Sequence, residues 1–590
     1  MTVASSPSLS LEDHLIELLS QAVAHVATEP NAPIVLERPK QASHGDYSTP
    51  IALQLAKLLR LPPREVANLI LARLPDSPLI ERSEIAGAGF INLFLSPAAR
   101  QSVVTEILAL GSDYARLNLG HQQPVLVEFV SSNPTGPLHV GHGRGAAFGA
   151  SLANLLDKAG YTVHREYYVN DAGRQMDILT VSTWLRALAL SPAFTFPFPA
   201  NGYQGDYVQS MAGDAMNLLA LGEPDSMDAA LRSASPHLMG QTVAADAEEA
   251  HMDCLIAAAK SLLGTTYGEL HVFVLAQQIE DCRQDLAEFG VTFDTWFSEQ
   301  SLFDSGAVAQ VVNRLSAAGH LYLRDGATWF RSTDFGDEKD RVVQRDNGLY
   351  TYFASDIAYH ANKFERGFSR LIDVWGADHH GYIPRVVAAL QALGYDTARL
   401  TVPLVQFVSL FRQGEKAQMS TRKGQFVTLR SLRHEVGRDA ARLFYVLRKS
   451  DQHLDFDLDL ALAQSQDNPV YYIQYAHARI ARVLERWQDD SVAPDSGHVD
   501  LSPLIHPAEV ALFKSLRTYP TVIRQAAQEL APHQVAFYLR DLAAEFHAYY
   551  NAVPFLDCHE SLARITLLKS IQTVLRDGLN LLGVSAPTSM

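Results

Sequence analysis

Residues 127–161, VEFVSSNPTGPLHVGHGRGAAFGASLANLLDKAGY, do most to decide the fold. The stretch begins within VLVEFV, a short apolar run rich in β-branched residues that is typical of a buried parallel strand. A turn with Pro and Gly follows, and a helix begins among Gly141, Gly143 and Gly145. Small residues there let a ligand approach the backbone, and unpaired N–H groups at a helix start attract anions. The stretch therefore predicts a phosphate site between a strand and a helix.

His139 and His142 lie three residues apart in the turn that enters this helix. Side chains at that spacing share one face, so both imidazoles are able to face the same anion. Charge that develops on a phosphoryl group is stabilised by donors held in place beforehand, which two imidazoles beside helix N–H groups supply. Two alternatives remain open, an HxxH zinc pair and two helix-capping histidines. The zinc pair has no third ligand at a recognisable spacing, so no structural zinc is expected.

The four residues His139-Val140-Gly141-His142 resemble the HIGH motif of class I aminoacyl-tRNA synthetases. The longer NPTGPLHVGHGR, with YVNDAGRQM and the helix QYAHARI, is similar to the arginyl-tRNA synthetase family, and the resemblance covers nearly the whole chain. It implies an arginine–tRNA ligase that activates L-arginine with ATP and Mg²⁺ and transfers it to the 3′-terminal adenosine of tRNA(Arg). It also implies catalytic roles for His139 and His142, ATP binding at Gly141 and Gly143, and a monomeric protein.

The hydrophobic pattern divides the 590 residues into three regions, which predicts a multidomain α/β protein. Residues 1–115 predict a small N-terminal α+β domain. Residues 116–464 alternate helices with the strand-like runs VLVEFV, TVHREYYV, RLIDVWG and LTVPLVQFV, which predicts a Rossmann-like, doubly wound catalytic domain with an inserted helical subdomain at about 175–300. Residues 465–590 predict an all-α bundle. By resemblance, the three regions bind the tRNA D-loop, carry out class I catalysis and bind the anticodon.

The bulk charge argues against a general affinity for nucleic acid. The net charge is −17 and the isoelectric point is near 5.7, whereas non-specific binding depends on Lys and Arg that neutralise phosphates. A specific RNA partner remains compatible with this charge, because local basic strips hold it while the acidic surface suppresses wrong partners. One basic run is placed to follow the inner limb of the tRNA: Arg430, Arg433, Arg438, Arg442, Arg448 and Lys449.

Neither a targeting signal nor a covalent framework is evident. The N-terminus lacks a basic segment followed by an apolar run, and no stretch has the apolar length needed to span a bilayer. We therefore expect a cytoplasmic protein with no membrane partner. Cys254, Cys282 and Cys558 are too far apart for a CxxC zinc site or a disulfide framework and are expected to be free thiols.

Residues 414–424, GEKAQMSTRKG, resemble the mobile KMSKS loop of the same class, whose lysine stabilises the triphosphate. Met419 and Ser420 match that motif and by resemblance contact ATP, whereas Gln418 and Thr421 stand where the family has lysines. The positive charges near enough to replace those lysines are Lys416 and the two catalytic candidates Arg422 and Lys423. Taken alone, the stretch would be interpreted as an exposed basic turn between strands.

The guanidinium of arginine is planar and permanently charged, so its pocket needs a carboxylate and further acceptors. Tyr352 and Asp356 stand at i and i+4 in LYTYFASDIAYH, and on a helix they would share a face. Such a pair is more often a surface contact, but the arginyl family has a Tyr and an Asp at this spacing and uses them on the guanidinium. The same resemblance places Glu128 and Asn133 at the amino and carboxyl groups of the amino acid. Glu128 lies in an apolar strand, where a buried carboxylate needs a partner.

Asp378, His379 and His380 come just after the strand-like RLIDVWG. The carboxyl ends of strands line the ligand crevice of an open α/β sheet, so these side chains are predicted to contact the adenosine of ATP or the substrate. A metal cluster is the alternative, but adjacent histidines rarely both bind one ion. We therefore expect no protein-bound metal ion.

Tyrosines and arginines at the start of the C-terminal region suit RNA, because aromatic rings stack on unpaired bases and arginines meet phosphates. By resemblance to the family's anticodon-binding helix, the contacts are Tyr471, Tyr475 and Arg479. The alternative is a bundle helix with buried tyrosines and solvated arginines. In the N-terminal region, Phe90 and Asn92 fall in a segment similar to the family's D-loop contact, although both could be plain strand residues.

Overall fold

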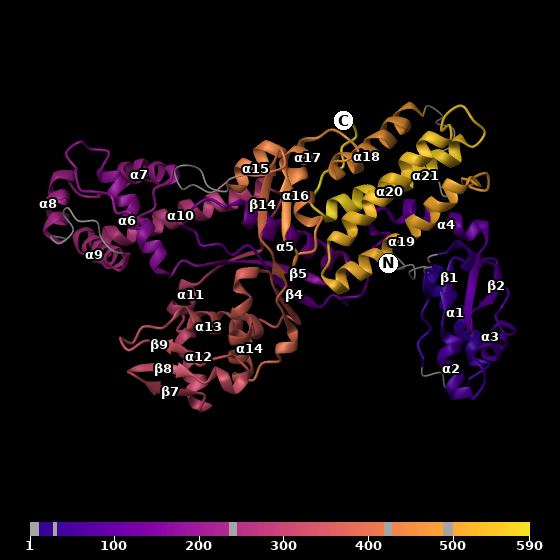
Figure 1. Cartoon of the computed structure of the whole chain (residues 1–590), viewed down its shortest axis with the longest axis horizontal. Helices are drawn as coiled ribbons and strands as arrows, with labels where there is room; N and C mark the ends of the chain where they lie inside the picture. The colour runs from indigo at the N-terminus through magenta and orange to yellow at the C-terminus, as the bar shows by residue number, and fades with distance from the viewer. Residues whose placement is uncertain (1–10, 28–31, 40, 235–244, 418–426, 488–498) are drawn as a thin grey trace, which may run out of the picture.

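The computed structural model describes residues 11–27, 32–39, 41–234, 245–417, 427–487 and 499–590. The molecule is elongated, with a parallel sheet near its middle (Figure 1). A helical insertion extends from the sheet at one end of the molecule, and the N-terminal region lies at the other end, next to the C-terminal helices. The regions predicted to bind ATP and the tRNA therefore lie in successive parts of one long body.

The N-terminal region is a small α+β unit built on an antiparallel sheet in the order β1-β3-β2. Its elements are α1 (Leu11–Ala24), β1 (Tyr47–Thr49), α2 (Ile51–Leu59), α3 (Pro63–Leu71), β2 (Ile80–Ala86) and β3 (Phe90–Leu95). Helix α1 forms because apolar residues recur at helical spacing, and Leu11, Leu15 and Leu19 are all buried. Helix α4 (Pro97–Leu110) follows, with the Ser96 hydroxyl accepting a hydrogen bond at its N-cap.

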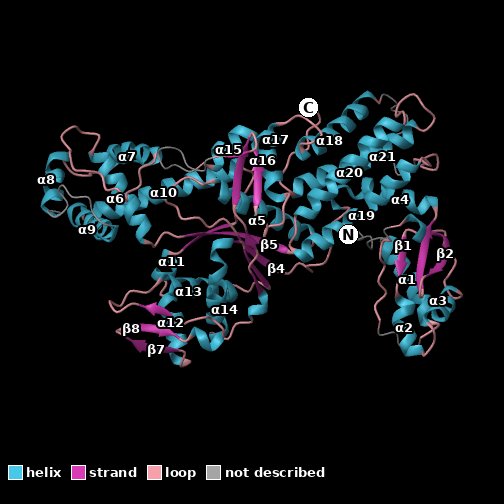
Figure 2. Cartoon of the chain, viewed as in Figure 1, coloured by secondary structure: helices cyan, strands magenta, loops and turns pink. Residues whose placement is uncertain are grey.

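The central sheet has five parallel strands in the order β12-β10-β4-β5-β6 (Figure 2). These strands are β4 (Pro124–Glu128), β5 (Thr162–Val169), β6 (Thr295–Ser298), β10 (Arg370–Asp373) and β12 (Leu400–Thr401). The chain passes from β4 to β5 on one side and later returns to β10 on the other, so the strand order reverses at β4. Ligands of open α/β sheets bind at such a point, outside the carboxyl ends of the strands. The prediction of a doubly wound α/β domain is confirmed.

Three helices surround this switch point. Helix α5 (Val140–Lys158) follows β4, α13 (Tyr352–Glu365) precedes β10, and α14 (Ile383–Ala392) follows it. Helix α5 is buried along most of its length, which suits its small and apolar residues. A small antiparallel sheet and two helices pack beside α13: α11 (Gln300–Asp304), α12 (Ala307–Ala317), β7 (Leu321–Arg324), β8 (Ala327–Phe330) and β9 (Arg341–Gln344).

Between β5 and β6 the chain leaves the sheet and forms the helical insertion. Its helices are α6 (Arg174–Leu188), α7 (Asp206–Leu218), α8 (Pro224–Ala234), α9 (Ala245–Leu263) and α10 (Thr265–Glu288). They share an apolar core of their own, in which Trp184 and Leu270 are fully buried. The insertion is therefore a packed subdomain, and α10 leads the chain back to the sheet (Figure 1).

A junction of short elements connects the sheet to the C-terminal region. Its strands are β11 (Trp375–Gly376), β13 (Leu404–Val405), β14 (Val408–Arg412), β15 (Glu415–Lys416) and β16 (Leu454–Asp457). Its helices are α15 (Leu429–Val436), α16 (Arg438–Val446) and α17 (Leu458–Leu462). The all-α bundle follows, as predicted: α18 (Pro469–Arg486), α19 (Pro507–Glu529), α20 (His533–Ala552) and α21 (Ser561–Leu581). Apolar residues of the bundle and of α5 belong to one continuous core.

Two further sequence expectations concern membranes and thiols. In the described ranges, no helix combines the length and the apolar character needed to cross a bilayer. Cys282 is buried, Cys254 is exposed and Cys558 is intermediate, and all three are free cysteines. The described part of the fold thus rests on packing and hydrogen bonds.

Candidate active site

The two histidines of HVGH form the start of α5. His139 is the N-cap residue, and its Nδ1 accepts hydrogen bonds from the backbone N–H groups of Gly141 (3.1 Å) and His142 (3.3 Å). The Nδ1 of His142 accepts one from the backbone N–H of His139 (3.3 Å), and the two rings stack with their centroids 3.5 Å apart. The helix-capping alternative is therefore real. It is compatible with anion binding, because these capping bonds use only the Nδ1 atoms.

The electrostatic state of the two rings follows from their surroundings. Burial lowers the pKa of His139, and burial together with the neighbouring His139 lowers the pKa of His142 to about 3. Both imidazoles are neutral near pH 7 as a result. At the phosphate site they would act as oriented N–H donors rather than as cations.

We expect this neutral pair to make stability depend on pH. In the unfolded chain a histidine protonates at a pKa of about 6.5, whereas His142 in the folded protein stays neutral down to about pH 3. Below the unfolded pKa the unfolded state binds more protons than the folded state. The contribution of the neutral His142 to stability is therefore complete above the unfolded pKa and is lost as the pH falls. The free energy of unfolding, measured with denaturant at pH 7 and pH 5, should fall more for the wild type than for His142→Gln, which keeps a capping side chain. Equal losses would remove His142 as the cause.

The glycines of this turn differ in what surrounds them. A Cβ atom at Gly143 would lie 2.7 Å from Leu429 Cδ1 and 2.8 Å from the hydroxyl of Tyr445, so glycine is needed there for α5 to pack on α15 and α16. A Cβ atom at Gly141 would meet the His139 ring at 2.9 Å, and one at Gly145 would meet nothing within 4 Å. Packing alone thus explains why a glycine stands at position 143, whereas packing does not require one at position 145.

Glu128, at the carboxyl end of β4, has the partner that a buried carboxylate needs. Its Oε2 accepts a hydrogen bond from the ammonium of Lys363 on α13, and its Oε1 accepts one from the Ser131 hydroxyl at 2.7 Å. The same ammonium donates to Asp373 Oδ1, at the end of the neighbouring β10, at 2.8 Å. The sequence interpretation missed Lys363 because Glu128 lies 235 residues away along the chain, and Asp373, ten residues away, lies on a different element.

Tyr352 and Asp356 lie at the start of α13, as the i and i+4 spacing requires. Tyr352 is 51% exposed, and its hydroxyl lies near Gly173, where an added Cβ atom would be 3.3 Å from it. Asp356 is half-buried and accepts a hydrogen bond from the Tyr382 hydroxyl. Burial raises the pKa of Asp356, although the hydrogen bond from Tyr382 opposes that rise. The Tyr and the Asp therefore stand beside the carboxyl ends of the strands.

A second carboxylate that sequence reasoning missed lies beside Asp356. Glu299 follows β6 and is 2% exposed, and its Oε1 accepts a hydrogen bond from Ser355 at 2.6 Å. Its Oε2 and the hydroxyl of Tyr168 on β5 are both buried, and this hydroxyl lies near enough to lower the pKa of Glu299. Burial raises the pKa of Glu299, and the charge of Asp356 adds to the rise. Two neighbouring buried carboxylates favour a ligand that brings a positive charge and several N–H donors.

The loop NPTG after β4 is held by the insertion. The side-chain amide of Asn133 donates to Gln175 Oε1 on α6 at 2.8 Å, and the hydroxyl of Tyr207 on α7 donates to the carbonyl of Thr135 at 2.7 Å. The Tyr207 hydroxyl would also lie 3.1 Å from a Cβ atom at Gly136. The insertion therefore contacts the loop that leads into the HVGH turn.

We expect Tyr207→Phe to slow the activation step that the resemblance implies about fivefold, because one hydrogen bond of roughly 1 kcal/mol no longer fixes the loop. Single-turnover kinetics of that step measure the rate. Tyr267→Phe is the matched control, since its hydroxyl donates to Asp177 at 2.6 Å within the insertion. If both variants slow the reaction equally, the effect comes from the stability of the insertion and not from the loop.

Asp378, His379 and His380 lie in an exposed turn after β11, Ala377–Tyr382. The closest polar approach among them is between His379 Nε2 and Asp378 Oδ2, at 3.5 Å. Among the residues that the structure describes, no group of three His, Cys, Asp or Glu side chains is placed to hold a metal ion. The last residue of this turn, Tyr382, donates the hydrogen bond to Asp356.

The loop residues Gln418, Met419, Ser420, Thr421, Arg422 and Lys423 lie outside the described residues. The described chain stops at Ala417 and resumes at Val427, whose carbonyl accepts a hydrogen bond from the backbone N–H of Val140 at 3.1 Å. Thr428 forms an antiparallel bridge with His139. After the stretch that resembles the KMSKS loop, the described chain thus resumes next to the start of α5.

The aromatic residues at the start of α18 form a half-buried cluster. Tyr471 stacks on Tyr475 with ring centroids 5.7 Å apart, and Tyr475 stacks on His547 at 5.7 Å. The guanidinium of Arg479 lies over the rings of Tyr475, at 4.9 Å, and Tyr550, at 4.2 Å. This arrangement lies between the two sequence alternatives, because the rings are neither fully buried nor fully exposed.

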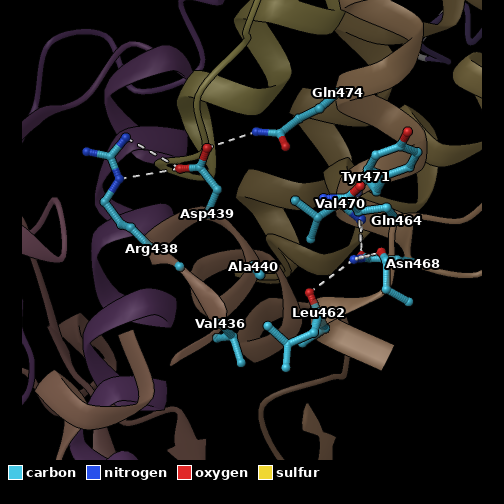
Figure 3. Close-up of a pocket in the computed structure, with 13 residues that line it drawn as sticks. Val436, Arg438, Asp439, Ala440, Leu462, Gln464, Asn468, Val470, Tyr471 and Gln474 are labelled. Carbon is cyan, nitrogen blue, oxygen red and sulfur yellow. Dashed lines mark hydrogen bonds and ion pairs between the residues drawn. The ribbon is translucent and has the colours of Figure 1, made fainter. Parts of the chain in front are cut away.

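A cavity of about 400 Å³ opens beside Tyr471, between α16, α17 and α18 (Figure 3). Gln474 lines it and donates to Asp439 Oδ2 at 2.8 Å. Asn468 also lines it and donates to the carbonyls of Ala461 (3.1 Å) and Ala463 (2.8 Å). These polar groups are held by the protein, and neither Glu128 nor Glu299 lines the cavity.

Two other tRNA predictions need qualification. The prediction that the basic run follows the tRNA is wrong for two of its residues: Arg433 is 7% exposed and pairs with Glu288 and Asp285, and Arg442 is fully buried against the carbonyl of Leu582. Its other residues are half-buried (Arg430) or exposed (Arg438, Arg448 and Lys449). In the N-terminal sheet, Phe90 is half-buried, whereas Asn92 is 3% exposed and its Oδ1 accepts a hydrogen bond from Ser48 at 2.8 Å. Reading a base with Asn92 would require this hydrogen bond to open.

Three family models match successive parts of the chain. Residues 13–95 match the arginyl tRNA synthetase N terminal domain, and residues 473–590 match the DALR anticodon binding domain. Residues 103–187 and 271–463 match the class I (R) tRNA synthetase catalytic domain. The stretch between the two catalytic segments lies within the helical insertion.

Similar proteins match over the full length. The arginine–tRNA ligase of Azoarcus sp. is 58% identical over 583 residues, which cover 98% of this chain and 99% of that protein. The arginine–tRNA ligase of Nitrosomonas europaea is 55% identical over 584 residues, 98% of each chain. The structure of the Thermus thermophilus arginyl-tRNA synthetase, 24% identical, has a TM-score of 0.70 and covers 98% of this chain and 100% of that one, which shows a shared fold.

The parallel sheet, the HVGH turn at its switch point and the matching catalytic model define a class I aminoacyl-tRNA synthetase. Within this class, the chain belongs to the arginyl-tRNA synthetase family. It is an enzyme, an arginine–tRNA ligase, and its reaction depends on ATP.

Proposed function

We propose that arginine is activated in the crevice at the carboxyl ends of β4, β5, β6 and β10. The observation that carries this proposal is the convergence of three carboxylates, Glu128, Glu299 and Asp356: the charges of Glu128 and Glu299 each interact with that of Asp356. Glu299 and Asp356 are close enough to contact the same group of the substrate, since Ser355, next to Asp356 in the chain, donates a hydrogen bond to Glu299. A permanently charged, planar group with several N–H donors fits such a site.

Each end of arginine has candidate partners. Asp356 and Tyr352 bind the guanidinium, and Glu299, a buried carboxylate whose charge interacts with that of Asp356, accepts a further N–H. Glu128 binds the α-ammonium and Asn133 the α-carboxylate. Lysine would satisfy these acceptors poorly, because its ammonium is a point charge without the planar fork of arginine.

Activation forms the mixed anhydride of arginine and AMP. An oxygen of the arginine carboxylate attacks the α-phosphorus of ATP, and the bond from that phosphorus to the bridging oxygen breaks to release pyrophosphate. The rings of His139 and His142 donate to the phosphoryl oxygens, and Gly141 and Gly143, which have no side chains, let the phosphates of ATP approach the start of α5. Contacts to the adenosine and the triphosphate are completed by Asp378, His379, His380, Met419, Ser420, Arg422 and Lys423.

Transfer follows at the same site. The 2′-hydroxyl of the 3′-terminal adenosine of tRNA(Arg) attacks the activated carbonyl, and AMP leaves. Tyr471, Tyr475 and Arg479 contact the anticodon, and Phe90 and Asn92 contact the D-loop. Support for the anticodon role comes from the half-exposed, stacked rings of Tyr471 and Tyr475, which suit stacking on unpaired bases.

The remaining features concern the setting of the reaction. ATP enters as its Mg²⁺ complex, and because Mg²⁺ keeps phosphate and water ligands, it needs few ligands from the protein. The enzyme acts as a monomer in the cytoplasm. Size-exclusion chromatography with light scattering tests the monomer.

ATP–pyrophosphate exchange with each of the twenty amino acids, with and without total tRNA, tests the proposed function. We expect exchange with arginine alone, and only when tRNA is present, as the family resemblance implies. Exchange with another amino acid would contradict the assignment of the carboxylate pocket to arginine. Exchange with arginine in the absence of tRNA would keep the pocket but remove the tRNA requirement.

A further inference from the structure

Lys363 is a fully buried lysine on α13, two turns after Asp356. Its ammonium lies between two carboxylates, Glu128 on β4 and Asp373 on β10. Burial opposes the charge, but Asp373 and Glu128 outweigh burial and raise the pKa of Lys363. The side chain is therefore a cation enclosed within the protein, and it has no surface with which to touch a substrate.

His360 lies one turn before Lys363 and approaches the same Asp373. Its Nδ1 is 2.8 Å from the backbone carbonyl oxygen of Asp356, and its Nε2 is 3.1 Å from Asp373 Oδ2. Both ring nitrogens of His360 therefore have an acceptor within hydrogen-bond distance. Lys363 and His360 lower the pKa of Asp373 against the effect of its burial. Two side chains of one helix thus hold two carboxylates at the strand ends.

We infer that Lys363 and His360 are positioning residues for arginine, which fix the helix carrying Tyr352 and Asp356 to the strand ends carrying Glu128. The inference rests on the roles proposed above for Glu128 and Asp356. Lys363 acts through Glu128: it donates to Oε2 of this carboxylate while Ser131 donates to Oε1, so both oxygens are held in place. His360 acts through the carbonyl of Asp356, in the helical turn that sets the direction of the Asp356 side chain.

The geometry has a specific consequence for substrate binding. If Lys363 is removed, Glu128 remains buried at 6% exposure with only Ser131 to hold it, and a carboxylate in that position either takes up a proton or turns away. The α-ammonium of arginine then loses its anion. Because the proposed function places ATP at neither group, the KM for arginine should rise while the KM for ATP stays constant.

The test is a double-mutant cycle of Lys363→Met and Glu128→Gln, measured by arginine-dependent ATP–pyrophosphate exchange in the presence of tRNA. We expect each single variant to raise the KM for arginine about tenfold or more, with the KM for ATP changed less than about twofold. The double variant should resemble Glu128→Gln alone, because Lys363 acts through Glu128. Multiplied effects in the double variant would overturn the inference. If Lys363→Met does not fold, Lys363→Gln, which is one atom shorter than lysine but keeps an N–H donor, replaces it in the cycle.

The same helix supplies a matched control. Arg366 holds the buried Glu166 of β5 with bonds of 2.6 and 3.0 Å, and the other partner of Glu166 is the Tyr359 hydroxyl at 2.9 Å. Arg366→Gln should lower the melting temperature without changing the KM for arginine. If Lys363→Met does no more than this, Lys363 is structural only and the inference is wrong.

The outcomes for the inference and for the proposed function can be told apart. An unchanged KM for arginine in Glu128→Gln would remove the proposed role of Glu128, and the inference would fall with it. A raised KM in Glu128→Gln with a normal KM in Lys363→Met would leave that role intact and overturn the inference alone. His360→Phe, which keeps a ring but removes both ring nitrogens, should raise the KM for arginine several-fold. A wild-type KM for arginine in that variant would show that His360 is not a positioning residue.

Discussion

Asp356→Asn is expected to lower kcat/KM for arginine about 10²- to 10³-fold. Asparagine keeps the shape of the side chain and an acceptor for the Tyr382 hydroxyl, which donates to Asp356 in the wild type. What it removes is the negative charge opposite a guanidinium that never loses its proton. Removing one partner of a buried, hydrogen-bonded charge pair costs about 3–4 kcal/mol, which corresponds to the stated range. Arginine-dependent ATP–pyrophosphate exchange with tRNA measures the loss.

The specificity of this effect separates a pocket residue from a structural one. The KM for ATP should stay within about twofold of the wild type, because the change affects only the arginine pocket. Glu299→Gln should give a smaller loss of the same kind, since Ser355 continues to hold that side chain. If Asp356→Asn keeps wild-type kcat/KM while Glu299→Gln loses it, the guanidinium lies on Glu299 and the assignment of Asp356 is wrong.

His139→Asn is expected to lower kcat for adenylate formation about 10²- to 10³-fold, the usual effect of losing one preorganised donor to a developing oxyanion. Asparagine is a favourable N-cap residue, so its Oδ1 replaces the Nδ1 that accepts from Gly141 and His142. The helix start is thereby preserved and only the remainder of the imidazole is lost. Single-turnover adenylate formation and the melting temperature, measured together, show whether rate and stability separate.

The chain offers a second capping histidine as a control. His506 is the N-cap of α19, and its Nδ1 accepts from the backbone N–H of Ala508 at 3.2 Å in another capping box. His506→Asn should leave adenylate formation unchanged, because α19 belongs to the C-terminal bundle. If His139→Asn is as active as His506→Asn, the histidines of HVGH serve only to cap α5 and the proposed transition-state role fails.

Local patterns in the sequence predicted the central sheet and the start of α5. The run VLVEFV became β4 with Glu128 at its end, and RLIDVWG became β10 and β11. Tyr352 and Asp356 could be paired because four residues on a helix always return to the same face. Each of these features depends on residues that are neighbours in the chain, so spacing and residue type are sufficient to find them.

Burial, by contrast, could not be read from charge alone. Arg433 and Arg442 were interpreted as part of a basic strip, yet α10 and the end of α21 cover them. Asn92 was assigned to a base, yet it lies inside the N-terminal sheet against Ser48. A charged or polar residue looks the same in a sequence whether its partner is solvent or a distant element of the fold.

The sequence by itself determined the class of the enzyme, the position of the HVGH turn and the strand that carries Glu128, because each is encoded in one continuous stretch. Only the tertiary structure decided what surrounds them. Glu299 reaches Asp356 through Ser355, 56 residues away from it along the chain, and Lys363 reaches Glu128 across 235 residues. In this site the parallel strands align their carboxyl ends, and that alignment brings buried charges from distant parts of the chain together.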